Sequence, residues 1–234
     1  QYKMNKMFGH LRKGVRQPEL DNFTHQALLY TLQYYKPDLT LVHFTDLDTQ
    51  RHYYGFNSTQ SIQALNRHDQ RLGEIIRTLK EENMYEESTL ILLGDHSTLD
   101  TNKIIYLNSI FNQRGYLTIN NKRVKDWRVI AKSCDGSCYI YMKDKQIYPE
   151  VKALLEDLAK DKANGIESIY SRKEAENLGA DPYCDFMVEA SLGYYFLDDI
   201  EEQLIIDIEP DKKGTMVATH GYSPYKTGYT TVFM

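Results

Sequence analysis

Hydrophobic positions in the first hundred residues follow two kinds of spacing. In residues 22–35 and again in residues 58–79, apolar side chains recur at steps of three and four, which predicts two amphipathic helices. Residues 39–44 and 88–93 are short runs that are almost entirely apolar. Runs of this kind favour strands buried on both faces of a parallel sheet.

The order helix, strand, helix, strand is typical of a doubly wound, mostly parallel α/β sheet. Beyond residue 100 the spacing becomes mixed and predicts an inserted α+β region at about residues 100–210. The elements expected there are strands at 128–132, 138–142, 186–189 and 204–208, and helices at 149–163 and from Ser171, where Ser171 and Glu174 have the spacing of a capping box. We therefore predict one α/β domain over residues 1–234 that contains this inserted region.

Composition narrows the class of protein. Hydrophobic residues make up 41% and charged residues 26% of the 234 residues, close to the globular average, and no apolar stretch is long enough for a membrane span. The net charge of -5 argues against a nucleic-acid polymer as the main partner, because such binding uses clustered Lys and Arg. A small anionic substrate remains compatible with this charge if bound metal supplies the positive charge.

The cysteines and the chain ends give two further expectations. Cys134, Cys138 and Cys184 are an odd number, and no signal-peptide pattern is present, which favours a reducing, cytoplasmic setting unless a cleaved or truncated N-terminus hides a signal. Gln1 stands where an initiator Met would be, and residues 229–234 form a β-branched and aromatic run without a turn signal. We expect the chain to be a fragment of a longer protein.

Candidate metal ligands follow the first predicted strand. In open α/β sheets the chemistry lies beyond the carboxyl ends of the strands. Asp48 and His52 follow residues 39–44 and stand four residues apart, so on a helix they share one side, where one metal ion can bridge them. Taken alone, an ordinary acid and histidine pair on a solvated turn is the commoner explanation.

Two more candidates follow later apolar segments. Asp95 and His96 come directly after residues 88–93, and His220 lies between Thr219 and Gly221. Each is weak evidence alone, because Asp95 is also suited to capping the next segment and a lone His is more often a core or surface residue. Together, three segment ends that supply Asp and His suit a divalent zinc, manganese or iron ion.

These motifs occur in a fixed order along the chain, from about Asp38 to about Tyr225. The motifs are Asp48-x-x-x-His52-x-x-Gly55, a helix with Asp69, the run 88–96 that ends in Gly94-Asp95-His96, and Thr219-His220-Gly221. The set is similar to the type I phosphodiesterase and nucleotide pyrophosphatase branch of the alkaline phosphatase superfamily.

The resemblance implies roles for individual residues. Asp48, His52 and His220 are expected to hold one metal ion, while Asp95 and His96 hold part of a second. The family completes the second site with an Asp and a Thr or Ser nucleophile that lie upstream of anything matched here. The resemblance thus implies an alkaline phosphatase-like core whose N-terminal part is missing, with no catalytic nucleophile in this chain and no turnover by the chain alone.

For the intact protein, the resemblance implies a hydrolase of phosphodiester or pyrophosphate bonds that acts on a small phosphoester or nucleotide. It implies two divalent metal ions, with Zn²⁺ expected and Mn²⁺ as the other choice. Tyr53 and Tyr54 flank the first motif and are weak candidates for stacking on a base or aryl group. The alternatives are a phosphatase, sulfatase, or phosphonate or phospholipid hydrolase of the same superfamily, or a non-catalytic metal-binding relative. The oligomeric state is left open.

The remaining histidines receive ordinary interpretations. His43 is expected to be a hydrogen-bonded core residue, and His68 to be solvated on a charged helix. His10 and His25 have no ligand partner in view. One departure from the family concerns Ser97, which stands where the family usually has Gly, so we expect either a different turn after His96 or a serine hydroxyl that serves in place of the glycine.

Overall fold

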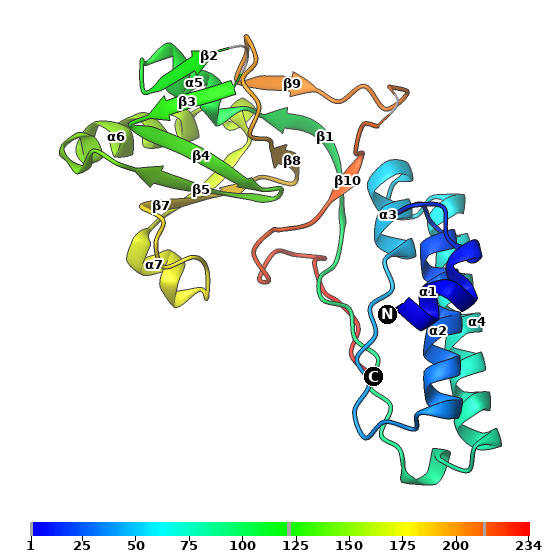
Figure 1. The fold of residues 1–234 in the computed structure, drawn as a ribbon. Coiled ribbons are helices and arrows are strands. Elements are labelled where there is room, and N and C mark those ends of the chain that lie inside the picture. The colour runs from blue at the N-terminus through cyan, green and yellow to red at the C-terminus, as the bar shows by residue number, and fades with distance from the viewer. Residues whose placement is uncertain (1, 121–122, 213) are drawn as a thin grey trace. The chain divides into compact units, whose positions relative to one another are not determined.

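The computed structural model describes residues 2–120, 123–212 and 214–234 (Figure 1). The chain divides into two compact units. The first contains Gln1–Gly94 and Val232–Met234, and the second contains Asp95–Thr231. No helix among the described residues is long and apolar enough to cross a lipid bilayer.

The first unit is built from helices. Its elements are α1 (Tyr2–Phe8), η1 (Gly9–Leu11), α2 (Glu19–Tyr34), α3 (Asp46–Tyr54), α4 (Thr59–Glu81) and η2 (Tyr85–Glu87). Both predicted helices are confirmed, as α2 and α4. Helix α4 begins after Ser58, whose hydroxyl accepts the N–H of Ser61. The two helices share a small apolar core formed by Leu28, Leu32, Ile75 and Leu79.

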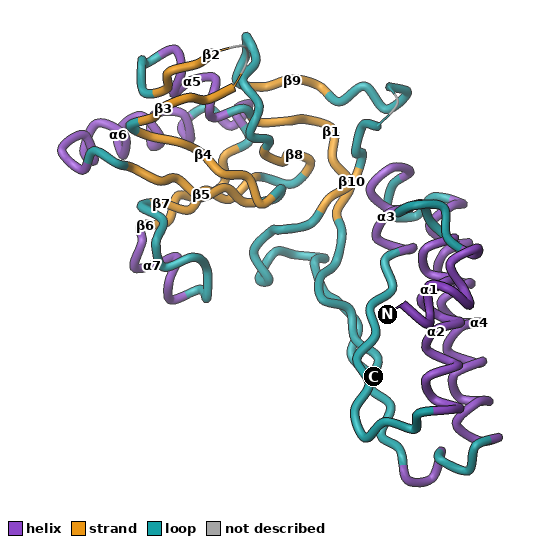
Figure 2. The backbone as a smooth tube through the Cα atoms, viewed as in Figure 1, coloured by secondary structure: helices purple, strands orange, loops and turns teal. Residues whose placement is uncertain are grey.

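The prediction of regular strands at residues 39–44 and 88–93 is wrong for the structure described. Both segments are extended but lack a strand ladder, and Figure 2 draws them mostly as loop. A single antiparallel bridge joins Leu93 to Phe233. Leu41 is 87% exposed, although its apolar run favoured burial. A buried strand needs hydrogen-bonded neighbours as well as apolar side chains, and the described residues provide only 232–234 beside residues 92–94. The doubly wound parallel sheet stays a prediction.

The second unit contains strands β1 to β10, and most of these strands pair antiparallel. Its strands are β1 (Leu99–Ile105), β2 (Leu117–Asn120), β3 (Arg123–Trp127), β4 (Val129–Cys134), β5 (Ser137–Met142), β6 (Ile166–Ser171), β7 (Phe186–Ala190), β8 (Gly193–Phe196), β9 (Ile205–Asp207) and β10 (Ala218–Thr219). Its helices are α5 (Leu107–Gln113), α6 (Tyr148–Lys160), α7 (Arg172–Asn177) and the short η3 (Lys145–Ile147) and η4 (Lys162–Asn164). One sheet has the order β4-β5-β7-β6; in another, β1 pairs parallel with β8 and antiparallel with β9 and β10.

Most elements expected at about 100–210 are confirmed. Strands β4, β5, β7 and β9 and helix α6 lie close to the predicted ranges, and the capping box of Ser171 and Glu174 opens α7. Strands β1, β2, β3, β6, β8 and β10 and helix α5 were not predicted. The core is packed around fully buried side chains such as Phe111, Ile140 and Leu155, and it supports the turn that carries His220.

Candidate metal-binding site

Helix α3 presents Asp48 and His52 on one side. His52 Nε2 lies 3.2 Å from Asp48 Oδ1, one turn apart, so the predicted pairing of the two side chains is confirmed. The His52 side chain is largely buried, and that of Asp48 is about one-third exposed. A carboxylate oxygen and an imidazole nitrogen at this separation form two adjacent donors of the types that zinc prefers.

The sequence of α3 suits a short helix. Asp46 and Asp48 lie in the first turn and Arg51 and His52 in the last, an order that complements the helix dipole. Gly55 follows with φ of 96°, a conformation that L side chains rarely adopt, and its N–H bonds to the carbonyl of Arg51. The metal-ligand spacing therefore falls on a helix with defined ends.

In the second unit, the pairing of β1 with β10 brings His96 and His220 together. Leu99 is opposite Thr219 in this antiparallel pair, so the residues just before β1 and just after β10 are neighbours. The rings of His96 and His220 stack with centroids 3.7 Å apart and an interplanar angle of 24°. Two motifs separated by more than a hundred residues thus contribute imidazoles to one place.

A hydrogen bond orients the ring of His96. Its Nδ1 lies 2.9 Å from the carbonyl oxygen of Ser97, which can only accept, so Nδ1 donates this bond and Nε2 is the nitrogen placed to ligate a metal ion. Asp95 lies beside it, with Oδ1 accepting the His96 backbone N–H at 3.2 Å and Oδ2 at 3.7 Å from Nε2. The buried Ser97 contributes its backbone here, which a glycine would also supply, so this departure from the family leaves the contact intact.

The turn after His220 packs closely on the connection between β4 and β5. The carbonyl of His220 accepts the N–H of Gly136 at 2.8 Å. Gly221 has φ of 76°, and a Cβ added there would lie 1.8 Å from the carbonyl oxygen of Cys134. Gly221 is thus required by both its backbone conformation and the contact.

A buried ion pair holds the segment beyond this turn. Lys226 Nζ lies 3.0 Å from Glu189 Oε1, and the same oxygen accepts the N–H of Ser223 at 2.9 Å. Burial raises the pKa of Glu189. Sequence reasoning missed this pair, because a Glu in a strand and a distant Lys carry no spacing signal.

The exposure of the other residues singled out in the sequence bears on the remaining predictions. Tyr53 and Tyr54 are about half exposed. His43 is exposed, so its prediction as a core residue is wrong, since the segment that carries it is not a buried strand. His68 is partly buried and accepts the N–H of Leu47 at 3.3 Å, so the prediction of a solvated His68 is also wrong. Burial lowers its pKa.

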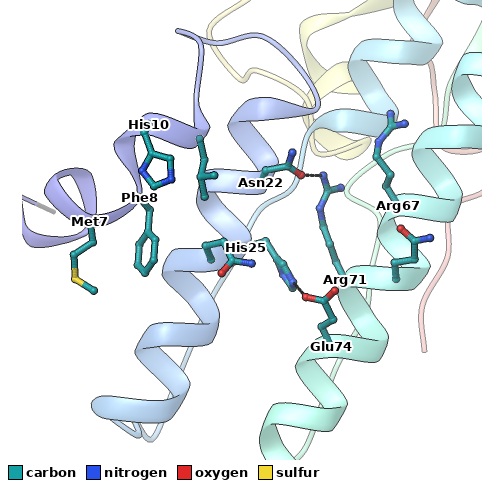
Figure 3. A pocket seen from close by; sticks show the side chains of 11 residues that line it. Met7, Phe8, His10, Asn22, His25, Arg67, Arg71 and Glu74 are labelled. Carbon is teal, nitrogen blue, oxygen red and sulfur yellow. Dashed lines mark hydrogen bonds and ion pairs between the residues drawn. The ribbon is translucent and has the colours of Figure 1, made fainter.

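A pocket of about 570 Å³ lies in the first unit among α1, η1, α2 and α4. Its lining includes His10, His25 and Arg71, and Figure 3 shows the ion pair of His25 with Glu74 beside it. It contains none of the predicted metal ligands. The candidate site therefore does not coincide with this pocket.

Comparison with known proteins gives the class. The model of the family "Type I phosphodiesterase / nucleotide pyrophosphatase" matches residues 3–223, so this chain belongs to that family. The matched range includes all five predicted metal ligands.

Individual relatives agree with the family. The chain is 33% identical over 79 residues to a venom phosphodiesterase of Naja atra, a match that covers 33% of the chain and 10% of that protein. It is similar to the structure of murine ectonucleotide pyrophosphatase/phosphodiesterase 5, with a TM-score of 0.62, 16% identity, and coverage of 91% of this chain and 51% of that one.

The chain is also similar to the structure of a phosphonoacetate hydrolase of Sinorhizobium meliloti 1021, solved in complex with phosphonoacetate. The TM-score is 0.66 at 16% identity, and the match covers 98% of this chain and 53% of the hydrolase chain. The chain thus spans about half the length of the solved structures it matches. At this level of identity the structural similarities show an alkaline phosphatase-like fold.

Proposed function

We propose that the protein containing this chain is a hydrolase of phosphodiester or pyrophosphate bonds in small, nucleotide-like substrates, and that it uses two divalent metal ions. The observation that carries the proposal is the pairing of Asp48 with His52 at 3.2 Å inside the segment matched by the family model. An inactive threonine-to-alanine variant of the similar murine protein has been solved in complex with AMP, which supports a nucleotide as the substrate class.

We assign Asp48, His52 and His220 to one ion, and Asp95 and His96 to part of the other. The donor set supports this assignment, because carboxylate and neutral imidazole are the ligands that Zn²⁺ prefers, with Mn²⁺ as the second choice. The bond from His96 Nδ1 to the Ser97 carbonyl supports it further, since it leaves Nε2 as a donor and fixes the orientation of the ring.

When bound, two divalent cations would offset charge on the phosphate oxygens and lower the pKa of an attacking hydroxyl. The side chains of this chain would supply the atoms that hold the two cations in place. Asp48 would contribute a carboxylate oxygen and His52 an imidazole nitrogen from the same side of α3. We propose that the attacking Thr or Ser, and the Asp that completes the second site, belong to a segment that precedes this chain. The cytoplasmic location stays a prediction.

The experiment is a combined metal and activity assay on the full-length protein. We expect bound zinc and faster hydrolysis of bis(p-nitrophenyl) phosphate than of p-nitrophenyl phosphate. Asp48→Asn and His52→Gln should each lower the diesterase rate by about 100-fold or more, because each removes a donor. His10→Gln, on an exposed His of the same unit, is the control and should hydrolyse at the wild-type rate.

Two results would contradict the proposal. Absence of hydrolysis of either ester with both metals loaded would overturn the assignment as a hydrolase. Preference for the monoester would replace the phosphodiesterase with a phosphatase.

A further inference from the structure

The N-terminus of α3 is capped by a residue of another helix. Thr45, at the N-cap position, makes no capping bond with its own side chain. Instead the carboxylate of Asp21, on α2, accepts the N–H of Asp46 at 2.9 Å and that of Thr45 at 3.1 Å. Asp21 is 1% exposed, so this carboxylate satisfies the first N–H groups of α3 out of contact with water.

Two arginines of α4 complete the cluster. Arg67 forms a two-pronged ion pair with the fully buried carboxylate of Asp46, with Nε at 2.6 Å and Nη2 at 3.0 Å. Arg71 Nη1 lies 3.6 Å from Asp46 Oδ2 and 3.7 Å from Asp21 Oδ2, between the two carboxylates. Figure 3 shows the other end of this guanidinium bonded to Asn22, at 3.0 Å. The charges of two carboxylates are thus matched by two guanidinium groups.

Apolar packing contributes little to fixing α3. Among its nine residues, Asp46 is the one that is buried. Taking carboxylates and guanidinium groups out of water costs several kcal/mol per ion, and apolar replacements of such clusters are often no less stable. A cluster of this kind is therefore better explained by the geometry it imposes than by the stability it adds. Asp48 lies two residues after the anchored Asp46 on the same helix, and His52 lies one turn after Asp48.

We propose that Asp21 and Arg71 are positioning residues for the metal ligands of α3. By holding the first turn of α3, they set the rotation of the helix about its axis and so the direction in which Asp48 and His52 present their donor atoms. This inference rests on the proposed function, because it takes Asp48 and His52 as metal ligands. Outer partners of this kind orient ligands and tune metal affinity.

The chain offers a matched control. His25 and Glu74 also join α2 to α4, by an ion pair of 2.9 Å in which His25 is buried, but no bond from this pair to α3 is recorded among the described residues. Glu74→Gln removes an ionic link between the same two helices. A purely structural role of Asp21 would make its variants behave like this control.

The test measures metal affinity and unfolding separately, in the full-length protein. We expect Asp21→Asn and Arg71→Met to weaken zinc binding about 10-fold or more in competition with a chromophoric chelator, and Glu74→Gln to keep wild-type affinity. With Co²⁺ in place of zinc, the two cluster variants should show an altered visible absorption spectrum, which a loss of stability alone would not produce. Arg71→Lys, which keeps the charge, should recover part of the affinity.

A milder variant keeps the inference falsifiable if the others fail to fold. Gln17→Ala removes the donor that bonds Asp21 Oδ1 at 2.8 Å and Thr45 Oγ1 at 2.7 Å, without changing any charge. It should weaken zinc binding in the same direction. If wild type binds zinc and hydrolyses the diester while all cluster variants keep wild-type affinity and cobalt spectra, the positioning role is overturned alone. A wild-type protein that binds no zinc overturns both proposals.

Discussion

The imidazole rings of His96 and His220 stack with their centroids 3.7 Å apart. His220 follows β10 and His96 precedes β1, so the contact depends on the antiparallel pairing of Leu99 with Thr219. Packing alone can account for stacked rings, whereas two rings that each ligate a metal ion must also keep their donor nitrogens. A substitution that keeps an aromatic ring but removes its nitrogens distinguishes a packing role from a metal-binding role.

His220→Phe should therefore retain the stacked ring and lose the donor. We expect it to keep near wild-type stability but to bind zinc roughly 10-fold or more weakly, as His220→Ala also should. Zinc affinity is measured by competition titration and stability by urea unfolding. Wild-type zinc affinity in His220→Phe would show that this ring serves packing and not metal binding.

The close packing of Gly221 gives a second prediction with a matched control. Gly221 and Gly228 share φ of 76°, but a Cβ at Gly221 would meet the Cys134 carbonyl at 1.8 Å, whereas Gly228 has nothing within 4 Å. Both Ala variants carry the left-handed backbone penalty of about 1–2 kcal/mol. Gly221→Ala should lose about 1–3 kcal/mol more, because the backbone must move. The difference in unfolding free energy checks this, and equal losses would contradict the contact.

Local spacing was enough to predict the parts of the site that depend on one helix. The four-residue step from Asp48 to His52 determines their common side once the segment is helical, and the capping box of Ser171 likewise depends on near neighbours. The contact of His96 with His220 depends on a strand register across more than a hundred residues, which periodicity does not encode. The resemblance to the family named both histidines as ligands, but of different ions, and their stacking was not predicted.

The wrong and missed predictions also arise from contacts between segments that are distant in the sequence. Residues 39–44 and 88–93 have the composition of buried strands, but a strand also depends on its neighbours, which a single segment cannot specify. The same error placed His43 in a core. The charged cluster of Asp21 with Arg71 was missed because residues on α2 and α4 meet through helix packing, and no short motif records that contact.

The environment of His68 predicts a dependence of stability on pH. Burial, then the charge of Arg71, lowers the pKa of His68, while Asp21 and Asp46 oppose the shift and Arg67 adds to it. The neutral ring also accepts the N–H of Leu47. Because the folded state disfavours the protonated form, this contribution to stability is complete above the ordinary pKa of 6.5 and is lost as pH falls below it.

We expect the unfolding free energy to fall between pH 8 and pH 5, and to fall less in His68→Gln, whose amide oxygen can accept the same N–H without titrating. Urea unfolding at a series of pH values measures the slope. His10→Gln, on an exposed His, serves as the control and should keep the wild-type slope. A slope in His68→Gln equal to that of wild type would assign the pH dependence to other groups.

The ion pair of Lys226 with Glu189 gives the last prediction, because both side chains are almost completely buried. Lys226→Met would leave the Glu189 carboxylate buried without its partner, at a cost of about 3–5 kcal/mol in unfolding free energy at neutral pH.

Adding Glu189→Gln removes that charge, so the double variant should be more stable than Lys226→Met alone. Burial already raises the pKa of Glu189. The loss of unfolding free energy in Lys226→Met should therefore become smaller as pH falls and the Glu189 carboxyl becomes protonated. Urea unfolding of the single and double variants at pH 7 and pH 5 measures both effects. A double variant less stable than the single one would mean that Glu189 stabilises the segment after His220 through Ser223, independently of Lys226.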